Sequence, residues 1–124
     1  MRKVGLKPGE MAIGLKVPYV AGQKAVFTKF DRRKEVDLST VCATVGKFND
    51  EYRVAIGSCA PTPIRLPKTE ALLKGKKLTP ELIGEAAELA GSEVSPISDV
   101  RASAEYRVSL VKVAVRRSLA ELSV

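Results

Sequence analysis

The residues best suited to bind a charged ligand lie in one short stretch between two apolar, strand-like segments. The stretch KFDRRKEVD holds four cations and three carboxylates: Lys29, Asp31, Arg32, Arg33, Lys34, Glu35 and Asp37. Grouped guanidinium and ammonium groups can hold a phosphate, a carboxylate or an acidic protein surface. The same composition is typical of a solvent-exposed loop, and the residue types alone leave both interpretations open.

The excess positive charge of the chain is concentrated at its N-terminal end. The 124 residues carry a net charge of +7, and residues 1–34 hold nine basic against two acidic residues, which equals the whole excess. A one-sided field of this kind favours an anionic partner, such as a nucleic acid, an acidic protein surface or a cofactor that carries phosphate. A solvated basic surface without a specific partner is the alternative.

Several kinds of site are disfavoured by what the sequence lacks. It has no histidine and only two cysteines, Cys42 and Cys59, which argues against a zinc site and removes the commonest general base. We expect both thiols to be reduced and partly buried in strands. No glycine-rich phosphate loop is present. No apolar run approaches the roughly 20 residues of a membrane span, and no signal core follows the basic start, so the expected location is cytoplasmic.

Alternating apolar residues predict that the first half of the chain consists of strands. The candidates are residues 11–17, 25–30, 38–48 and 52–60. The third candidate has one apolar face, made by Val41, Ala43 and Val45. If the turn that follows is centred on Asp50–Glu51, Cys42 and Cys59 lie opposite each other, whereas a slip of one residue separates them. The sequence leaves this register open.

A proline-rich stretch, APTPIRLP, separates the strands from a helical second half. Each proline fixes φ and holds the preceding residue in extended geometry, so the stretch is stiff. It has no P-x-x-P motif and no Ser/Gly tract, which argues against a ligand for another protein and against a flexible linker. We therefore interpret it as a rigid crossover from the last strand to the first helix.

Three helices are predicted after this crossover. The first, KTEALLKG, ends at Gly75. The second begins with Thr79 as its N-cap and ends at Gly91, and the third spans about residues 98–122. Strands followed by helices predict an α+β fold, in which one antiparallel sheet carries the helices on a single face.

The chain resembles the C-terminal domain of the FAD-binding (medium) subunit of molybdenum hydroxylases, the family of carbon monoxide dehydrogenase and xanthine dehydrogenase. The resemblance covers roughly residues 10–122 and is carried by KFDRRKEVDLSTVCATV, VAIGSCAPTPIRLPKTEALLKGKKL and ISDVRASAEYRVSLVKVAVRRSL. Its most specific positions are Gly57, Ala60, Pro61, Thr62, Pro63, Arg65, Ser98, Asp99, Arg101, Ser103, Tyr106 and Arg107. The resemblance implies an antiparallel sheet of three to four strands and about three helices.

The resemblance also implies a division of the chain and a set of partners. Residues 21–124 would be the C-terminal domain, and residues 1–20 resemble the tail strand and junction of a preceding FAD-binding domain that is missing here. In such enzymes electrons pass from molybdenum in a large subunit, through iron–sulfur clusters in a small subunit, to FAD in the medium subunit. The expected partners are these two subunits and a separate FAD-binding domain, without which FAD is expected to be absent from the chain.

The same resemblance gives the charged stretch a candidate role. In the family this loop lies near the flavin, which makes Lys29, Arg32, Arg33 and Asp37 candidate cofactor-binding residues, with no catalytic residue and no metal ligand. A cation at the pyrimidine edge would stabilise the negative charge of the reduced ring, and Asp37 could hold an arginine in place. We expect these cations to lack sufficient partners in their own chain and to face the FAD-binding domain.

Other interpretations remain beside this one. Arg101 and Tyr106 are expected to tie the last helix to the proline crossover, with a subunit contact as the alternative. A small nucleic-acid-binding module would suit the basic N-terminal end, but the chain has six aromatic residues and no basic helical stripe. A structural or assembly domain without flavin contact is the third possibility.

Overall fold

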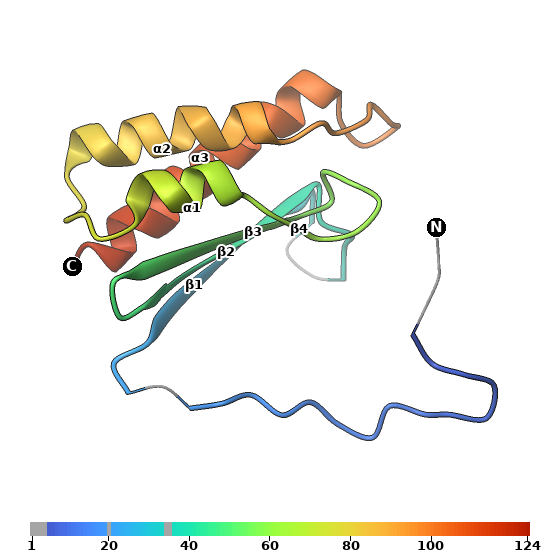
Figure 1. Cartoon of the computed structure of the whole chain (residues 1–124). Helices are drawn as coiled ribbons and strands as arrows, with labels where there is room; N and C mark the ends of the chain where they lie inside the picture. Colours follow the sequence, from blue (N-terminus) through green and yellow to red (C-terminus); the bar gives the residue numbers. More distant parts are fainter. Residues whose placement is uncertain (1–4, 20, 34–35) are drawn as a thin grey trace.

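Over residues 5–19, 21–33 and 36–124, the ranges that this computed structural model describes, the chain forms a four-stranded antiparallel sheet with three helices on one of its faces (Figure 1). The strands lie in the order β1-β2-β3-β4, so sequence neighbours are also sheet neighbours. The elements are β1 (Lys24–Phe30), β2 (Val41–Phe48), β3 (Glu51–Gly57), β4 (Ile64–Arg65), α1 (Pro67–Leu73), α2 (Pro80–Glu93) and α3 (Ala104–Leu122). The predicted α+β architecture is confirmed.

The core lies between the sheet and the helices and is built by alternation along the two central strands. β2 and β3 turn every second side chain towards the helices, and these buried residues are Val41, Ala43, Val45, Tyr52, Val54 and Ile56. α3 and α1 pack against the sheet, and α2 packs against these two helices. The buried helical residues include Leu73, Ile83, Ala86, Ala90, Val111, Val115 and Leu119. Each large aliphatic side chain removed from water contributes roughly 1.5–3 kcal/mol. The apolar face predicted for residues 38–48 is confirmed.

The turn between β2 and β3 sets the register of the sheet. It consists of Asn49–Asp50, one residue before the centre considered from the sequence, because Phe48 pairs with Glu51. Its first residue takes a φ of 55°, a left-handed conformation that asparagine adopts more readily than most residues. As a result Cys42 lies opposite Gly57 rather than Cys59. Both thiols are free, Cys42 half-buried and Cys59 buried just beyond β3.

Residues 11–17, predicted as a strand, pair with no other described residue. In Figure 1 this segment runs away from the start of β1 as an extended trace. Apolar alternation supplies a face, but a strand also needs a neighbour for its backbone N–H and C=O groups, and none of the described residues provides one there. The prediction of a strand is therefore wrong for the chain by itself. The exposed apolar side chains that result are Met11, Ile13, Leu15, Val17 and Tyr19.

The proline-rich stretch leads from β3 to α1, as predicted, and it also contributes an edge strand. Its residues Ile64–Arg65 form β4, which pairs antiparallel with β3. Leu66 is fully buried, and Pro67 is the first residue of α1, where its missing N–H costs no helical hydrogen bond. Gly75 follows α1 with a φ of 68°, which confirms the predicted end of the first helix.

α2 begins where predicted but continues two residues past Gly91. The hydroxyl of Thr79 accepts a hydrogen bond from the N–H of Leu82 at 3.3 Å, as expected of an N-cap. Gly91 lies inside the helix, where an added Cβ would meet the Cε atom of Lys112 on α3 at 2.6 Å. This glycine therefore marks the close approach of two helices rather than a helix end.

The carboxylate of Glu93 ties the end of α2 to the start of α1. One oxygen accepts a hydrogen bond from the N–H of Lys68 at 2.9 Å, and the other accepts from the N–H and the hydroxyl of Thr69 at 2.7 and 2.6 Å. The first N–H groups of a helix have no partner within it, so Glu93 supplies one from outside. Thr69 is fully buried, which makes this acceptor hard for water to replace.

Replacing Glu93 with glutamine should lower the free energy of unfolding by about 1–2 kcal/mol, because the amide offers one acceptor where three donors converge. Urea denaturation followed by circular dichroism measures the change. Glu85→Gln is the matched control, since Glu85 is exposed on the same helix and its replacement should shift stability by less than about 0.5 kcal/mol. Equal losses in the two variants would contradict the assigned link.

Candidate functional site

The described residues of the charged loop between β1 and β2 converge on Asp37. Its carboxylate accepts hydrogen bonds from the N–H groups of Arg32 at 3.1 Å and Leu38 at 2.9 Å, and lies 3.7 Å from the guanidinium of Arg33. Burial acts to raise the pKa of Asp37, but these N–H groups and the nearby guanidinium charges outweigh it and hold that pKa below its usual value. Asp37 is thus an ionised carboxylate that organises the loop.

Lys29 joins the same cluster from β1. Its Nζ lies 3.0 Å from the carboxylate of Asp31 and donates a hydrogen bond to the backbone oxygen of Asp37 at 2.9 Å. The preceding residue, Thr28, faces the helices, where its hydroxyl lies 3.0 Å from that of Ser118. Because side chains alternate along a strand, Lys29 points to the face of the sheet that carries no helix.

The structure brings the four candidate residues together but changes the account of their charges. The cations were expected to lack sufficient partners in their own chain, but Lys29 and Arg33 both pair with carboxylates of the loop. The side chain of Arg33 is still 73% exposed, and an exposed pair at this distance holds it only weakly. Lys34 and Glu35 lie outside the described residues.

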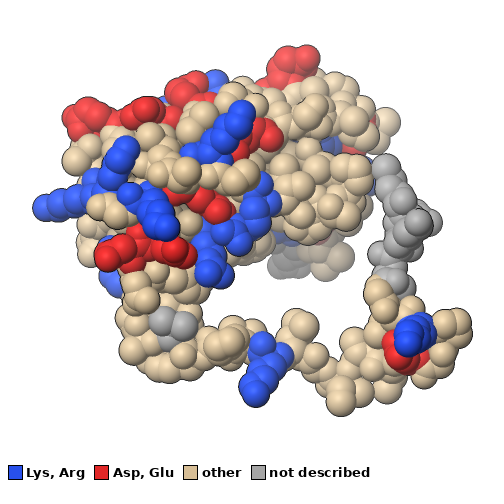
Figure 2. Space-filling model, in the orientation of Figure 1, with Lys and Arg blue, Asp and Glu red and all other residues tan. Residues whose placement is uncertain are grey.

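Charges of opposite sign interleave at the other end of the molecule. Figure 2 shows blue and red side chains side by side over the end that carries the β2–β3 turn. Lys74 lies 3.5 Å from Glu51 there, and Arg65 is paired with Glu70 close by. On the face shown, such local compensation differs from the single-sign stripe that a nucleic-acid-binding surface presents.

A pocket of about 540 Å³ opens beside the charged loop. It is lined by residues of the segments 38–39, 58–61 and 95–101 and by Arg107 of α3. The first segment continues directly from Asp37, so the pocket and the loop lie at the same end of the sheet. A volume of this size suits a small molecule or a few side chains of a partner.

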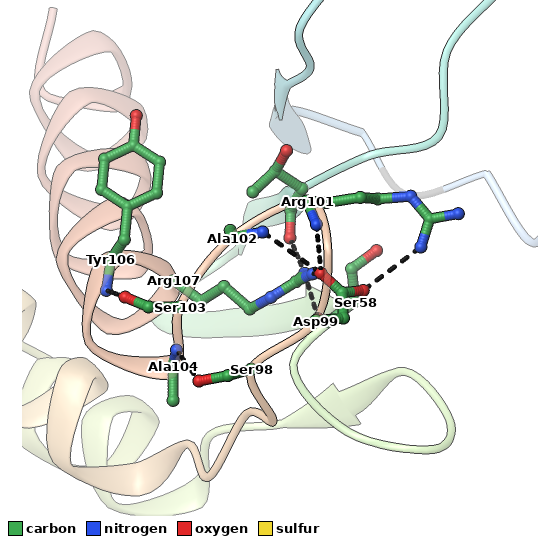
Figure 3. A network of polar contacts seen from close by, with 10 residues as sticks. Ser58, Ser98, Asp99, Arg101, Ala102, Ser103, Ala104, Tyr106 and Arg107 are labelled. Atoms are coloured by element: carbon green, nitrogen blue, oxygen red, sulfur yellow. Dashed lines mark hydrogen bonds and ion pairs between the residues drawn. The ribbon is translucent and has the colours of Figure 1, made fainter.

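Arg107, in the first turn of α3, holds this end of the molecule together. Its side chain is 5% exposed. One terminal nitrogen donates to the backbone oxygens of Thr40 and, at 3.2 Å, Ser58, while the other donates to a carboxylate oxygen of Asp99 at 2.7 Å (Figure 3). A single guanidinium therefore connects the segment before β2, the segment after β3 and the loop that precedes α3.

Asp99 is the counter-ion of two arginines. Besides Arg107, it accepts hydrogen bonds from the N–H groups of Arg101 at 2.8 Å and Ala102 at 3.2 Å, and its second oxygen lies 3.2 Å from the guanidinium of Arg101. The bond from the N–H of Arg101, aided by the guanidinium of Arg107 and opposed by burial, holds the pKa of Asp99 well below its usual value. The carboxylate is saturated by donors within its own chain.

This use of Asp99 explains why α3 begins later than predicted. The expected start at Ser98 or Asp99 is wrong, because the side chain of Asp99 closes a turn with the next residues instead of capping a helix. The helix begins at Ala104, and the hydroxyl of Ser103 accepts the N–H of Tyr106 at 3.2 Å as its N-cap.

Arg107, and not Arg101 or Tyr106, ties the last helix to the chain before the proline crossover, through the backbone oxygen of Ser58. Tyr106 is 56% exposed and its ring points away from the network in Figure 3, while Arg101 pairs within its own loop. The sequence did contain a signal for Arg107. It lies three residues after Ala104 and four before Val111, which places a charged residue on the apolar side of the helix, where it needs buried partners.

The part of the chain that the structure describes contains no helix with both the length and the hydropathy of a membrane span. The same residues hold no group of three or more Cys, Asp or Glu side chains placed to share a metal ion.

Sequence comparison relates the chain to one family. The model of the CO dehydrogenase flavoprotein C-terminal domain matches residues 25–122. The glyceraldehyde dehydrogenase medium chain of Sulfolobus acidocaldarius is 30% identical in an alignment that covers 93% of this chain and 42% of that protein. The putative xanthine dehydrogenase FAD-binding subunit of Escherichia coli K12 is 29% identical in an alignment that covers 96% of this chain and 43% of that protein. The chain spans less than half the length of these relatives.

Solved structures show the same fold. Carbon monoxide dehydrogenase from Hydrogenophaga pseudoflava, solved in a form lacking the Mo-pyranopterin moiety of the molybdenum cofactor, superposes with a TM-score of 0.74. The identity is 30%, over 82% of this chain and 37% of the other. The family match, over residues 25–122, covers the sheet from the second residue of β1 and helices α1, α2 and α3. The chain therefore belongs to the family of CO dehydrogenase flavoprotein C-terminal domains, found in the FAD-binding subunits of molybdenum hydroxylases.

Proposed function

We propose that the chain is the C-terminal domain of a flavoprotein subunit that acts together with a separate FAD-binding part. The observations that carry the proposal are the match of residues 25–122 to this domain and the exposed apolar side chains of the segment from Met11 to Tyr19, which is suited to pair with another sheet. Its partners would be an FAD-binding domain, a molybdenum-binding large subunit and an iron–sulfur small subunit. Its role would be to cover one edge of the flavin and to dock the subunits during electron transfer.

The exposed segment from Met11 to Tyr19 supports a separate FAD-binding partner. Ile13 and Leu15 are each 95% exposed, and every second side chain of the segment is apolar. A strand with this pattern is suited to pair with the edge of a sheet in another protein, where its backbone gains hydrogen bonds and its apolar face is buried. Residues 1–20 would then complete the FAD-binding part, as the tail strand and junction do in the family.

The charged loop fits one part of FAD and not the rest. Lys29 and Arg33, held by Asp31 and Asp37, offer positive charge suited to the electron-rich pyrimidine edge of a flavin. The backbone N–H of Arg32 donates to the carboxylate of Asp37, so the conformation of the loop determines where the Arg32 side chain lies. The sequence has no glycine-rich loop for the diphosphate, so that group would be held by the partner. When bound, FAD is the oxidant that takes up the electrons arriving from the iron–sulfur clusters.

The full chain alone should bind FAD with a Kd weaker than about 1 µM, because contacts to one ring edge fix few atoms of a large cofactor. Calorimetric titration measures this affinity. The comparison uses the portion of the Escherichia coli FAD-binding subunit that the chain does not match, which we call the FAD-binding part. Its affinity for FAD is measured once alone and once in a mixture with the chain. Tight binding by the chain alone would contradict the proposed division of labour.

A further inference from the structure

The pocket beside the charged loop carries an unbalanced positive charge. Of the charged side chains that line it, Arg101 and Arg107 are cations and Asp99 is the anion. Both guanidinium groups lie against the same carboxylate, at 3.2 and 2.7 Å. Because that carboxylate already accepts two backbone N–H groups, it cannot fully compensate both arginines, and one positive charge remains without a counter-ion in the pocket lining.

Hydrogen-bonding residues line the same pocket. Ser39, Ser58 and Ser95 are among the lining residues, and a serine hydroxyl can donate to a carboxylate oxygen. Among the residues that the structure describes, Nε of Arg107 is the buried side-chain atom without a hydrogen-bond partner, but its burial keeps it out of the contacts assigned to the occupant.

The rest of the lining is apolar and strained. Leu38 and Ile97 line the pocket although they are 66% and 77% exposed, so an occupant with an apolar body would remove both from water. Ser58 has a φ of 65°, a left-handed conformation that is uncommon for a residue with a side chain. This backbone geometry directs the oxygen of Ser58 to Arg107, and such strain is often stored where a ligand binds.

We propose that this pocket binds a carboxylate carried on an apolar body, and that the FAD-binding part supplies it from a side chain or chain end at the domain junction. The source of the carboxylate rests on the proposed function. The chemistry of the pocket does not, because it follows from one surplus charge and an apolar rim. A polypeptide source is favoured over a free acid because the pocket adjoins the charged loop, which is expected to face the same partner.

The pocket chemistry is tested on the full chain with hexanoate as the probe, and hexylamine as a probe with the same tail and opposite charge. Nuclear magnetic resonance of the isotope-labelled chain should show saturable shifts, with a Kd of the order of millimolar, at the N–H of Ala60 and at Nε–H of Arg107. Hexylamine should leave both unchanged. Arg101→Gln should weaken hexanoate binding about tenfold, because it removes the surplus charge while the backbone N–H to Asp99 remains.

Arg116→Gln is the matched control, since Arg116 is an exposed arginine of α3 that pairs with Glu88 outside the pocket. It should bind hexanoate like the unmodified chain. Absence of shifts at the pocket, equal shifts with hexylamine, or equal losses in both variants would overturn the proposal.

The source of the carboxylate is tested by adding the FAD-binding part. Arg101→Gln should weaken that complex about tenfold, Arg116→Gln should not, and hexanoate should compete with it. If the complex forms with the same affinity in the Arg101→Gln variant and in the presence of hexanoate, the assigned source of the carboxylate is wrong. If no complex forms at all, the proposed function fails, while the hexanoate titration still decides the chemistry of the pocket.

Discussion

Replacing Arg107 with methionine is expected to destabilise the chain by about 3 kcal/mol, the largest loss among the single substitutions considered. Methionine keeps the apolar stem but removes the donors to the backbone oxygens of Thr40 and Ser58 and leaves Asp99 without its buried partner. Three chain segments then lose their common link. Urea denaturation measures the loss, and Arg116→Met on the same helix should cost less than about 0.5 kcal/mol because that arginine is exposed.

The same variant should change the pH dependence of stability. The pKa of Asp99 is lower in the folded chain than in the unfolded chain, so its contribution is present above the ordinary pKa of an aspartate, about 4, and is lost as the pH falls towards the folded value. Arg107→Met removes one cause of this lowering and leaves the N–H bonds from Arg101 and Ala102. The urea midpoint should therefore fall less between pH 6 and pH 3 in the variant than in the unmodified chain. An unchanged or steeper fall would show that Arg107 does not set the pKa of Asp99.

Reversing two charges of the loop is expected to have the largest effect on assembly. Arg32→Glu with Arg33→Glu should weaken the complex with the FAD-binding part about 10- to 100-fold, because like charges replace complementary ones at the interface. Association of the unmodified chain should slow as the salt concentration rises, because salt screens the attraction between charged surfaces. Association of the variant should not depend on salt in this way. The melting temperature of the lone chain should change little, since the side chain of Arg33 is 73% exposed. Interferometry at several salt concentrations measures both effects.

The control for this reversal is Lys76→Glu with Lys77→Glu, two exposed lysines near the β2–β3 turn, at the far end of the sheet. This variant has the same net charge as the loop variant, so it separates the position of the charges from their sum. Equal weakening in both variants would indicate long-range attraction without a loop contact. Unfolding of the lone chain by the loop reversal would identify the two arginines as internal structural partners.

The outcome along the chain shows which features a single sequence specifies. Alternation predicted the buried face of β2 because Val41, Ala43 and Val45 must lie on one side of any strand that contains them. Thr79 and Gly75 marked helix ends because a cap and a left-handed residue act locally. The register of β2 and β3 depended on one turn residue, Asn49, whose conformation the alternating pattern does not specify.

The errors arose where the pattern of a segment leaves out what its residues contact. Asp99 lies where the last helix was expected to begin, yet its oxygens are used by its own turn and by Arg107. Gly91 looks like a helix end, yet it makes room for Lys112 of another helix, 21 residues on. Residues 11–17 have the pattern of a strand but pair with no other described residue.

The most direct test of the account is hydrogen exchange of the chain with and without the FAD-binding part, read by mass spectrometry. Docking as proposed predicts slower exchange in residues 11–19, which gain strand hydrogen bonds, and in the segments 36–39 and 58–61 beside the pocket. The outer face of α2 should exchange at an unchanged rate, because the account places no partner there. Unchanged exchange in residues 11–19, or protection confined to α2, would contradict the central claim that this chain completes a separate FAD-binding partner.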